Sequence, residues 1–463
     1  MGNVVTAIDI GSHKVAVGIA IVDSDNKIKI VGESTYSSMG IKKGEITGID
    51  DATNAIANAL SIAERMAGLS VSSAYVSING RQILSNNNKG VVAISDVEIL
   101  EDDVRRALEQ ARTIAIPSSR EIVHLIPRQF IVDQQSGIKV PVGMTGSRLE
   151  VDAHIVSAPL TYIHNIEKCI QSIGLKIDGF VFTGWASAQA VLTSTEKELG
   201  VVLLDIGAGT VSICTFEDDA ITFSSSIPLG GSNVTRDLAA GLRLSLEDAE
   251  RIKVNALELL NDSSKKKKNI HVKELKPKEP TNVENGDKEQ QVNLKSKDEY
   301  ENKITEQDID FDSDIIDVTS LGIEGIKTIS KKLFIEYTQA RMEEIFKIVK
   351  DHIEEAGFQY KLPGGIVLTG GGSLLPGLTS LCKEIFGVPA RVGYPKGVTG
   401  LVDGLMSPSY SVLIGSLLCA VNDGGQKIQG RVKSRSPFRK TNVSSEDSII
   451  GKISSFVRKI LPV

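Results

Sequence analysis

The sequence is poor in the residues that build disulfide frameworks and zinc sites. It has only four cysteines and six histidines among 463 residues, and the cysteines lie far apart. That spacing excludes a disulfide framework and paired-cysteine zinc sites, and it predicts buried thiols in a reducing cytosol. Because no H-E-x-x-H or C-x-x-C pattern occurs, the sequence predicts no metal cluster of these residues. The cysteines are Cys169, Cys214, Cys382 and Cys419.

Long apolar runs and an excess of basic residues are also missing. The longest apolar segments, such as Val412–Val421, are shorter than the roughly 20 residues that a membrane-spanning helix needs. Basic residues number 52 and acidic residues 58, and the net charge of -6 excludes nucleic-acid binding driven by overall charge. No basic segment leads into an apolar run before Val4, so we expect no signal peptide and a soluble cytoplasmic protein.

The common phosphate-binding motifs are absent from the sequence, and a different glycine-containing motif occurs twice. There is no Walker A pattern, and no G-x-G-x-x-G follows a predicted strand. Instead, Val4–Val22 and Val201–Phe216 each contain a strand, an aspartate (Asp9 and Asp205), a glycine-rich turn and a second strand. The two copies predict two similar subdomains that face one site. Backbone N–H groups in such turns bind anions, and each carboxylate can hold a metal ion or its waters.

A third glycine-rich element, Gly364–Leu378, follows late in the chain. It predicts a strand that ends in three glycines, after which Ser373 caps a helix with Pro376 in its first turn. The three elements in this order resemble the actin, heat-shock chaperone and sugar kinase ATPase superfamily. The resemblance implies an α/β, actin-like fold, duplicated from a ribonuclease H-like unit, that binds ATP and Mg²⁺.

The resemblance also implies roles for residues of the three elements. Asp9 and Asp205 would act on Mg²⁺ and its waters, with Asp205 also counted as catalytic. The adenosine would be held by Gly370, Gly371, Gly372 and Ser373. The phosphates would be held by Gly11, Ser12, His13, Lys14, Gly207, Ala208, Gly209 and Thr210. For His13 the alternative is a turn residue without ligand contact.

Two further candidates lie on predicted helices. Gln189, on a helix predicted over Ala186–Gly200, lies 16 residues before the second aspartate, where actin-like ATPases keep the glutamine that orients the attacking water. The alternative is a surface glutamine. Glu250 and Lys253 lie three residues apart on one helix face, with Ser245 as the predicted N-cap. In the superfamily such a pair contacts the ribose and base, and the alternative is a solvated salt bridge.

Two other segments resemble one particular family within this superfamily. A compact α+β insertion is expected from about Arg81 to Ser157, and Gly137–Ser157 resembles the 1C (SHS2-type) subdomain of the FtsA family of actin-like bacterial cell division proteins. Gln339–Val349, on a helix that Ser330 caps, resembles the outer 2B lobe of that family, which faces the tubulin-like protein FtsZ.

Three stretches fall outside this predicted core. Residues 261–314 are charged, polar and poor in aromatics and predict a disordered insertion, whereas residues 424–444 predict a flexible basic linker. Residues 445–463 predict an amphipathic helix, because at about 100° per residue the apolar side chains fall within an arc of about 140°. The apolar residues are Ile449, Ile450, Ile453, Phe456, Val457, Ile460 and Leu461, and the basic ones are Lys452, Arg458 and Lys459.

The basic residues decide how this helix is interpreted. A helix docked on the protein core and a helix in a partner groove are the alternatives. Since each lysine or arginine near an anionic leaflet contributes about 1 kcal/mol, the basic face and the preceding linker favour a membrane interface. FtsA proteins end in the same arrangement.

Together these features identify the chain as a member of the FtsA family. We expect subdomain 1A in residues 1–81 and 159–198, 1C in 82–158, 2A in 199–228 and 363–423, and 2B in 229–362. The resemblance implies ATP binding with slow or regulatory hydrolysis, self-association, and tethering of FtsZ filaments, by their C-terminal tail, to the cytoplasmic face of the plasma membrane at the septum. Later division proteins would bind subdomain 1C.

Other functions remain open as alternatives. A PilM-like type IV pilus assembly protein shares the core and a similar insertion but lacks the final helix. A sugar kinase needs a sugar-binding lobe, and a heat-shock-type chaperone needs a β-sandwich domain, for which about forty residues after Asp423 are too few.

Overall fold

The computed structural model describes residues 3–113, 116–260, 314–357 and 362–425. The predicted insertion, apart from its last residue, nearly all of the predicted linker and the whole predicted amphipathic helix lie outside these ranges, so they remain predictions. Within the described ranges, no helix is long and apolar enough to cross a membrane.

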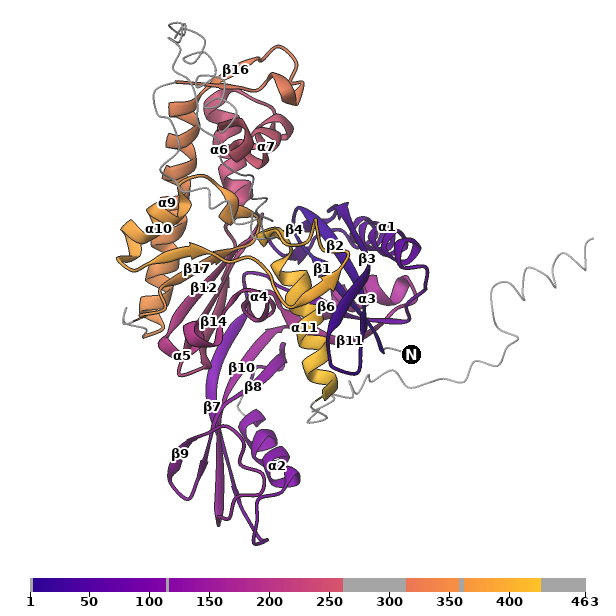
Figure 1. Cartoon of the computed structure of the whole chain (residues 1–463), viewed down its shortest axis with the longest axis vertical. Coiled ribbons are helices and arrows are strands. Elements are labelled where there is room, and N and C mark those ends of the chain that lie inside the picture. The colour runs from indigo at the N-terminus through magenta and orange to yellow at the C-terminus, as the bar shows by residue number, and fades with distance from the viewer. Residues whose placement is uncertain (1–2, 114–115, 261–313, 358–361, 426–463) are drawn as a thin grey trace, which may run out of the picture. The chain divides into compact units, whose positions relative to one another are not determined.

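Two sheets repeat one topology, as the duplicated motif predicts (Figure 1). In each, a hairpin continues into a third antiparallel strand on one side, while two parallel strands follow on the other. The first sheet has the order β11-β6-β1-β2-β3-β19 and the second β14-β13-β12-β17-β18. The first contains β1 (Asn3–Ile10), β2 (Lys14–Val22), β3 (Ile28–Ser37), β6 (Ser73–Ile78), β11 (Lys176–Phe182) and β19 (Val398–Gly400). The second contains β12 (Val201–Ile206), β13 (Val211–Glu217), β14 (Ala220–Ile227), β17 (Ile366–Thr369) and β18 (Ala390–Val392).

The central strands β1, β2 and β12 are buried on both faces over most of their length, and this explains their nearly continuous apolar sequences. Helix α11 packs against α4 and against β1, β2 and β6. A small hairpin, β4 (Ile41–Lys42) with β5 (Glu45–Ile46), follows β3. The helices of this part are α1 (Ile49–Ala67), α3 (Leu160–Ser172), α4 (Thr183–Val191), α5 (Ser194–Leu199), α10 (Leu378–Phe386) and α11 (Ser411–Gly425), with short 3-10 helices η3 (Gly371–Leu374) and η4 (Pro408–Tyr410).

The α+β insertion forms a separate sheet with the order β7-β10-β8-β9, on which helix α2 packs (Figure 1). The long strands β8 and β10 pair antiparallel over most of their length. Its own apolar cluster lies between the sheet and α2. The elements are β7 (Leu84–Ala93), α2 (Glu101–Arg112), β8 (Arg120–Val132), β9 (Gln135–Ile138) and β10 (Arg148–Pro159).

Side chains of strand β7 form hydrogen bonds with the backbone of strand β14 in the second sheet. Ser85 Oγ donates to the Ser224 carbonyl at 2.7 Å and accepts from the Ser224 N–H at 3.0 Å, while Asn87 Nδ2 donates to the Thr222 carbonyl at 2.9 Å. His154 is fully buried between these residues. Since the Asn87 amide nitrogen faces Thr222, Asn87 Oδ1 accepts from His154 Nδ1 at 2.7 Å, and the Ser224 hydroxyl donates to His154 Nε2. Burial lowers the pKa of His154 to about 3, so the ring is neutral at physiological pH and its unprotonated Nε2 accepts from that hydroxyl.

A second buried imidazole joins the insertion to the first sheet. His124 on β8 accepts the backbone N–H of Phe182, at the end of β11, with its Nε2 at 2.8 Å. Burial lowers the pKa of His124 to about 4. Both histidines thus make bonds that require a neutral ring.

The outer part of the second half is built from helices that pack together, α6 on α7 and α6 on α9 (Figure 1). Both predicted serine N-caps are confirmed: Ser245 Oγ accepts from Asp248 N and Ser330 Oγ from Leu333 N. The elements are α6 (Gly231–Leu242), α7 (Leu246–Val254), β15 (Ile315–Asp317), η2 (Thr319–Leu321), β16 (Thr328–Ser330) and α9 (Lys331–Glu355).

Two predicted helices differ from the structure. The helix predicted over Ala186–Gly200 is two helices, α4 and α5, because Thr193 caps the second one and accepts from Glu196 N in a capping box. The helix predicted to start at Ser373 begins at Leu378 instead, and Ser373 lies in the 3-10 turn η3 with its hydroxyl bonded to the Gly370 carbonyl at 2.7 Å.

Candidate functional site

The two Asp–Gly turns meet at one cavity of about 310 Å³, within the usual range for small-molecule sites. The first turn joins β1 to β2, where Gly11 N donates to the Lys14 carbonyl at 3.1 Å. The second joins β12 to β13 and repeats this bond from Gly207 N to the Thr210 carbonyl at 2.9 Å. The predicted residues that line the cavity are Asp9, Gly11, Ser12, His13, Lys14, Asp205, Gly207, Ala208, Gly209, Thr210, Glu250, Lys253, Gly370, Gly371 and Gly372.

The turns also touch each other, and Gly209 makes this contact sterically possible. A Cβ on Gly209 would lie 2.7 Å from Ser12 Oγ and 2.9 Å from backbone atoms of Lys43, in the turn of the β4–β5 hairpin. Ser12 Oγ accepts from Gly44 N at 2.9 Å in the same turn. The two phosphate-binding candidates and this hairpin therefore form one packed unit.

Two buried carboxylates, Asp9 near the end of β1 and Asp205 near the end of β12, line the same cavity. Ser77 donates to Asp9 at 2.9 Å, and Ser187 donates to Asp205 at 2.6 Å. Burial raises the pKa of Asp205 to about 7, the Asp9 charge adds to the rise, and the Ser187 bond opposes it. Burial also raises the pKa of Asp9, against the Ser77 bond and the charge of Lys14. Two carboxylates that repel each other in a cavity make a site that a cation would stabilise.

Lys14 lines the same cavity, with its Nζ 3.2 Å from the centroid of the Tyr410 ring. Burial lowers the pKa of Lys14 to about 8, while the charges of Asp9 and Glu33 oppose this shift. The lysine is thus a cation held in an apolar setting close to the first aspartate.

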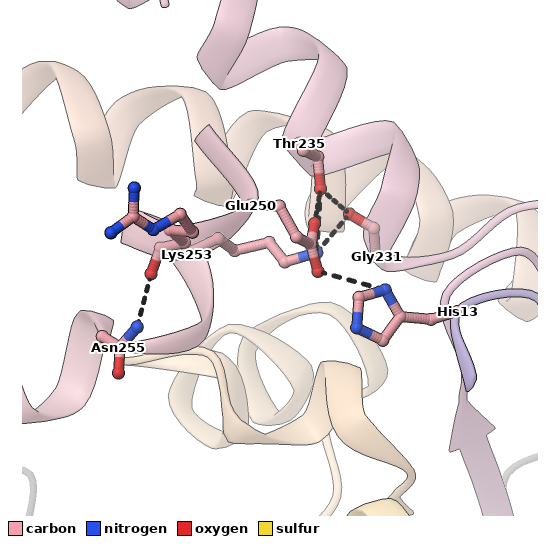
Figure 2. A network of polar contacts seen from close by, with 7 residues as sticks. His13, Gly231, Thr235, Glu250, Lys253 and Asn255 are labelled. Atoms are coloured by element: carbon pink, nitrogen blue, oxygen red, sulfur yellow. Dashed lines mark hydrogen bonds and ion pairs between the residues drawn. The ribbon is translucent and has the colours of Figure 1, made fainter. Parts of the chain in front are cut away.

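Glu250 and Lys253 on α7 form a hydrogen-bonded cluster with Gly231 and Thr235 on α6 (Figure 2). Lys253 Nζ donates to Glu250 at 2.6 Å, to Thr235 Oγ1 at 2.8 Å and to the Gly231 carbonyl at 3.1 Å. The alternative of a solvated salt bridge is wrong, because the Lys253 side chain is only 9% exposed. Since all three ammonium protons are used, Lys253 holds Glu250 in place and has no proton left for a ligand.

Glu250 keeps one oxygen available at the cavity. Its Oε2 accepts from Lys253 and from the Thr235 hydroxyl, whereas Oε1 lies 3.8 Å from His13 Nδ1 in the first turn. Burial would raise the pKa of Glu250, but the charge and hydrogen bonds of Lys253 and the Thr235 bond hold it below the usual value. Glu250 is therefore a carboxylate that can accept hydroxyl donors of a ligand.

The loop after β17 places glycines against the second turn. Gly370 has φ +79°, and a Cβ there would lie 2.3 Å from Asp205 Oδ1 and 2.6 Å from the Ile206 carbonyl. Gly370, Gly371 and Gly372 line the cavity, but Ser373, predicted to hold adenosine, is buried and outside its lining. The peptide geometry of the triplet, rather than the serine side chain, forms this wall.

Sequence comparisons agree with this geometry. The family model described as "Cell division protein FtsA" matches residues 202–415, and the one described as "SHS2 domain inserted in FTSA" matches residues 80–157. A protein named "Cell division protein FtsA" from Pseudomonas aeruginosa is 34% identical over 420 residues, 90% of this chain and 89% of its own. Its namesake from Neisseria meningitidis is 34% identical over 435 residues, 93% and 94% of the two chains. The chain belongs to the FtsA family of cell division proteins.

The solved PilM-PilN type IV pilus biogenesis complex is also similar, with a TM-score of 0.56 and 15% identity over 90% of this chain and 98% of that chain. At this identity the likeness shows the fold alone. The predicted actin-like fold with an SHS2 insertion is confirmed.

In this FtsA family member, Gln189 does not reach the cavity. Its Oε1 lies 3.4 Å from Lys197 Nζ, and the glutamine is not part of the lining. At about 100° per residue, Gln189 points about 160° away from Ser187, the residue of α4 that binds Asp205. Thr183, at the start of the same helix, lines the cavity instead.

Five polar residues around the aspartates and the second turn were missed by the sequence reasoning. Each is far along the chain from its hydrogen-bond partner, with sequence separations of 18 to 133 residues. No local pattern marks them, because serines, threonines and asparagines at strand ends are also common in turns. They are Ser77, Asn79, Thr183, Ser187 and Ser212.

Proposed function

We propose that the cavity binds ATP together with Mg²⁺. The observation that carries this is the meeting of two glycine turns from duplicated hairpins at a pair of buried aspartates, Asp9 and Asp205. The backbone N–H groups of the turns suit phosphates, and Glu250 suits ribose hydroxyls. Turnover is proposed to be slow or regulatory, because the water-orienting role expected of Gln189 has no support from its position.

The donor set at the aspartates fits Mg²⁺. Among the described residues, no group of three or more histidine, cysteine, aspartate or glutamate side chains is placed to hold a metal ion. Mg²⁺ is commonly held by one or two carboxylates together with substrate phosphates and waters, which is what Asp9 and Asp205 beside the two turns offer. When bound, the ion would neutralise charge on the phosphates, and the two aspartates would hold it and its waters.

We further propose the cellular role that the family name implies. As an FtsA family member, the protein would tether FtsZ filaments through subdomain 2B to anionic lipid on the cytoplasmic face of the plasma membrane at the septum. It would also self-associate and bind later division proteins through subdomain 1C. The support is membership of the family and the sequence of residues 445–463; many weak helices on one filament would bind strongly through avidity.

The PilM-like alternative has less support. Its likeness is one of fold at 15% identity, whereas relatives named as cell division proteins are 34% identical over most of the chain. The sugar kinase and chaperone alternatives need a sugar-binding lobe or a β-sandwich domain, and no feature described above supports either.

Gly209→Ala is expected to weaken ATP binding at least about tenfold, because the added methyl displaces Ser12 and the Lys43 backbone and separates the two turns. Isothermal titration with ATP, with Mg²⁺ and with EDTA, measures the effect. Gly404→Ala is the matched control, since its Cβ would meet no atom closer than 3.9 Å. Equal affinity of the wild type and Gly209→Ala would contradict the assignment of the turns as the phosphate site.

The tethering role is tested by liposome co-sedimentation with purified FtsZ. Full-length protein on anionic vesicles is expected to pellet FtsZ, and a chain that ends before Ser445 is expected to leave it in solution. If the protein pellets and FtsZ does not, a membrane-bound actin-like protein of another system becomes the better interpretation. If neither pellets, residues 445–463 are not a membrane anchor.

A further inference from the structure

Asn79 lies at the end of β6, where its side chain reaches from the first sheet to the second turn. Gly80 N donates to Asn79 Oδ1 at 2.8 Å, and since a backbone N–H only donates, this bond fixes which amide atom is the oxygen. The Asn79 amide nitrogen therefore faces Thr210 Oγ1 at 2.9 Å and Ser212 Oγ at 3.1 Å. Both of its protons are used on these two hydroxyl oxygens.

These two bonds decide where the hydroxyl protons point. Thr210 Oγ1 accepts from Asn79, so its own proton is turned away from the amide, and this hydroxyl donates no hydrogen bond to another of the described residues. Ser212 Oγ accepts from Asn79 and lies 2.8 Å from Thr183 Oγ1. Whichever of these two hydroxyls donates to the other, one proton is left over, and both residues line the cavity.

The same arrangement recurs in the first turn. Gly44 N donates to Ser12 Oγ at 2.9 Å, so the Ser12 hydroxyl proton also points elsewhere, and Ser12 lines the cavity. Hydroxyls are neutral groups that can accept or donate. In Ser12, Thr210 and Ser212 the hydroxyl oxygen already accepts a hydrogen bond from an N–H group of the protein. The hydroxyl proton is therefore the part that can bond to a ligand.

We infer that Asn79 is a positioning residue that turns the hydroxyl of Thr210, and one hydroxyl of the Ser212–Thr183 pair, into donors for anionic ligand oxygens. The inference rests on the proposed function and deepens it, because it names what makes this side of the cavity selective for phosphate groups. Two acidic side chains, Asp9 and Asp205, border the same cavity and repel an anion. Directed hydroxyl donors, together with the backbone of the turns and a cation, offset that repulsion.

Asn79→Asp tests the inference, because it keeps the shape of the side chain and exchanges two N–H donors for an acceptor. The hydroxyls of Thr210 and Ser212 then donate to residue 79 instead of to the ligand. Because the ligand loses two hydroxyl donors, each expected to contribute about tenfold or more, and meets an added negative charge, ATP affinity is expected to fall about 100-fold or more. Asn79→Ala removes the donors without adding charge and is expected to cost about tenfold.

The readout that separates positioning from general damage is the dependence on phosphate. Competition titrations compare adenosine, ADP and ATP, and the loss in both variants is expected to grow with the number of phosphates and to be small for adenosine. Asn58→Asp is the matched control, because this exposed asparagine on α1 bonds only to its own helix at Asn54. Urea unfolding of each variant checks that it remains folded.

Each outcome decides something. If Asn79→Ala binds ATP as the wild type does, or if adenosine and ATP lose affinity equally, the inference is overturned. If the wild type binds pyrophosphate with Mg²⁺ but not ATP, the proposed function fails, and the same variants test the inference with pyrophosphate. If the wild type binds neither, both fail.

Discussion

Asp205→Asn is expected to stabilise the ligand-free protein above pH 7 and to abolish the Mg²⁺-dependent part of ATP binding. The two effects have opposite signs because the buried, ionised carboxylate lowers the stability of the fold when no cation is bound, whereas Mg²⁺ binding requires it. Its pKa is raised from 3.8 to about 7, so the folded state binds the proton more tightly than the unfolded state. The stability that this contributes is complete below pH 3.8 and is lost as pH rises to about 7.

The expected size of the first effect follows from that shift. The pKa shift of about three units, at 1.36 kcal/mol per unit, corresponds to a free energy of unfolding on the order of 4 kcal/mol. The wild type loses this contribution between pH 4 and pH 8, whereas the variant, which has no carboxylate at this position, does not. Asparagine keeps an oxygen that can accept from Ser187, so the bond at 2.6 Å survives the change.

Urea unfolding at pH 4 and pH 8 measures the stability, and titration with ATP in Mg²⁺ or EDTA measures the binding. Asp25→Asn is the control, since the Asp25 side chain is 70% exposed and does not line the cavity. A variant that still binds ATP more tightly with Mg²⁺ than without it would rule out Asp205 as an ion ligand.

Acid is expected to destabilise the protein through His124 and His154, the two imidazoles that join the insertion to the sheets. Their folded-state pKa values of about 4 and about 3 lie below the usual 6.5, so the unfolded state binds the protons more tightly. Their contribution is complete above pH 6.5 and is lost as pH falls through these values. Together the shifts amount to about six pH units, on the order of 8 kcal/mol.

His124→Gln isolates one of these contributions. Glutamine offers an oxygen to the Phe182 N–H in place of Nε2 and does not titrate. The free energy that the wild type loses between pH 7 and pH 4.5 is expected to exceed the loss of the variant by about 2 kcal/mol or more. Urea unfolding at both pH values gives the comparison, with His164→Gln on the exposed side of α3 as control. Equal losses would show that His124 is not kept neutral by the fold.

Much of the site could be predicted because its central parts are local. Asp9 and Asp205 each lie on an apolar strand next to a glycine turn, and a pattern of a few neighbouring residues suffices to recognise them. The duplicated hairpin, the SHS2 insertion and the serine caps at Ser245 and Ser330 are likewise recognisable from neighbouring residues and are confirmed, whereas the cap predicted at Ser373 is wrong.

The prediction for Gln189 illustrates where the sequence stops being sufficient. Its distance along the chain from Asp205 matched the expected position, but the side of α4 that faces the cavity depends on how the helix packs against α11 and the second sheet. That packing turns Thr183 and Ser187 toward the cavity and its aspartate, and it turns Gln189 away from the cavity, against Lys197. Sequence spacing gives the phase between residues of a helix and not the direction of any one of them.

By itself the sequence determined the two Asp–Gly turns, the glycine triplet and the family to which the chain belongs. Only the tertiary structure decided which neutral side chains surround them, since Asn79 reaches Thr210 across 131 residues and Ser77 reaches Asp9 across 68. The physical reason is that backbone turns are fixed by neighbouring residues, whereas the hydrogen bonds that orient the hydroxyls and carboxylates of the cavity form only when distant strands come together.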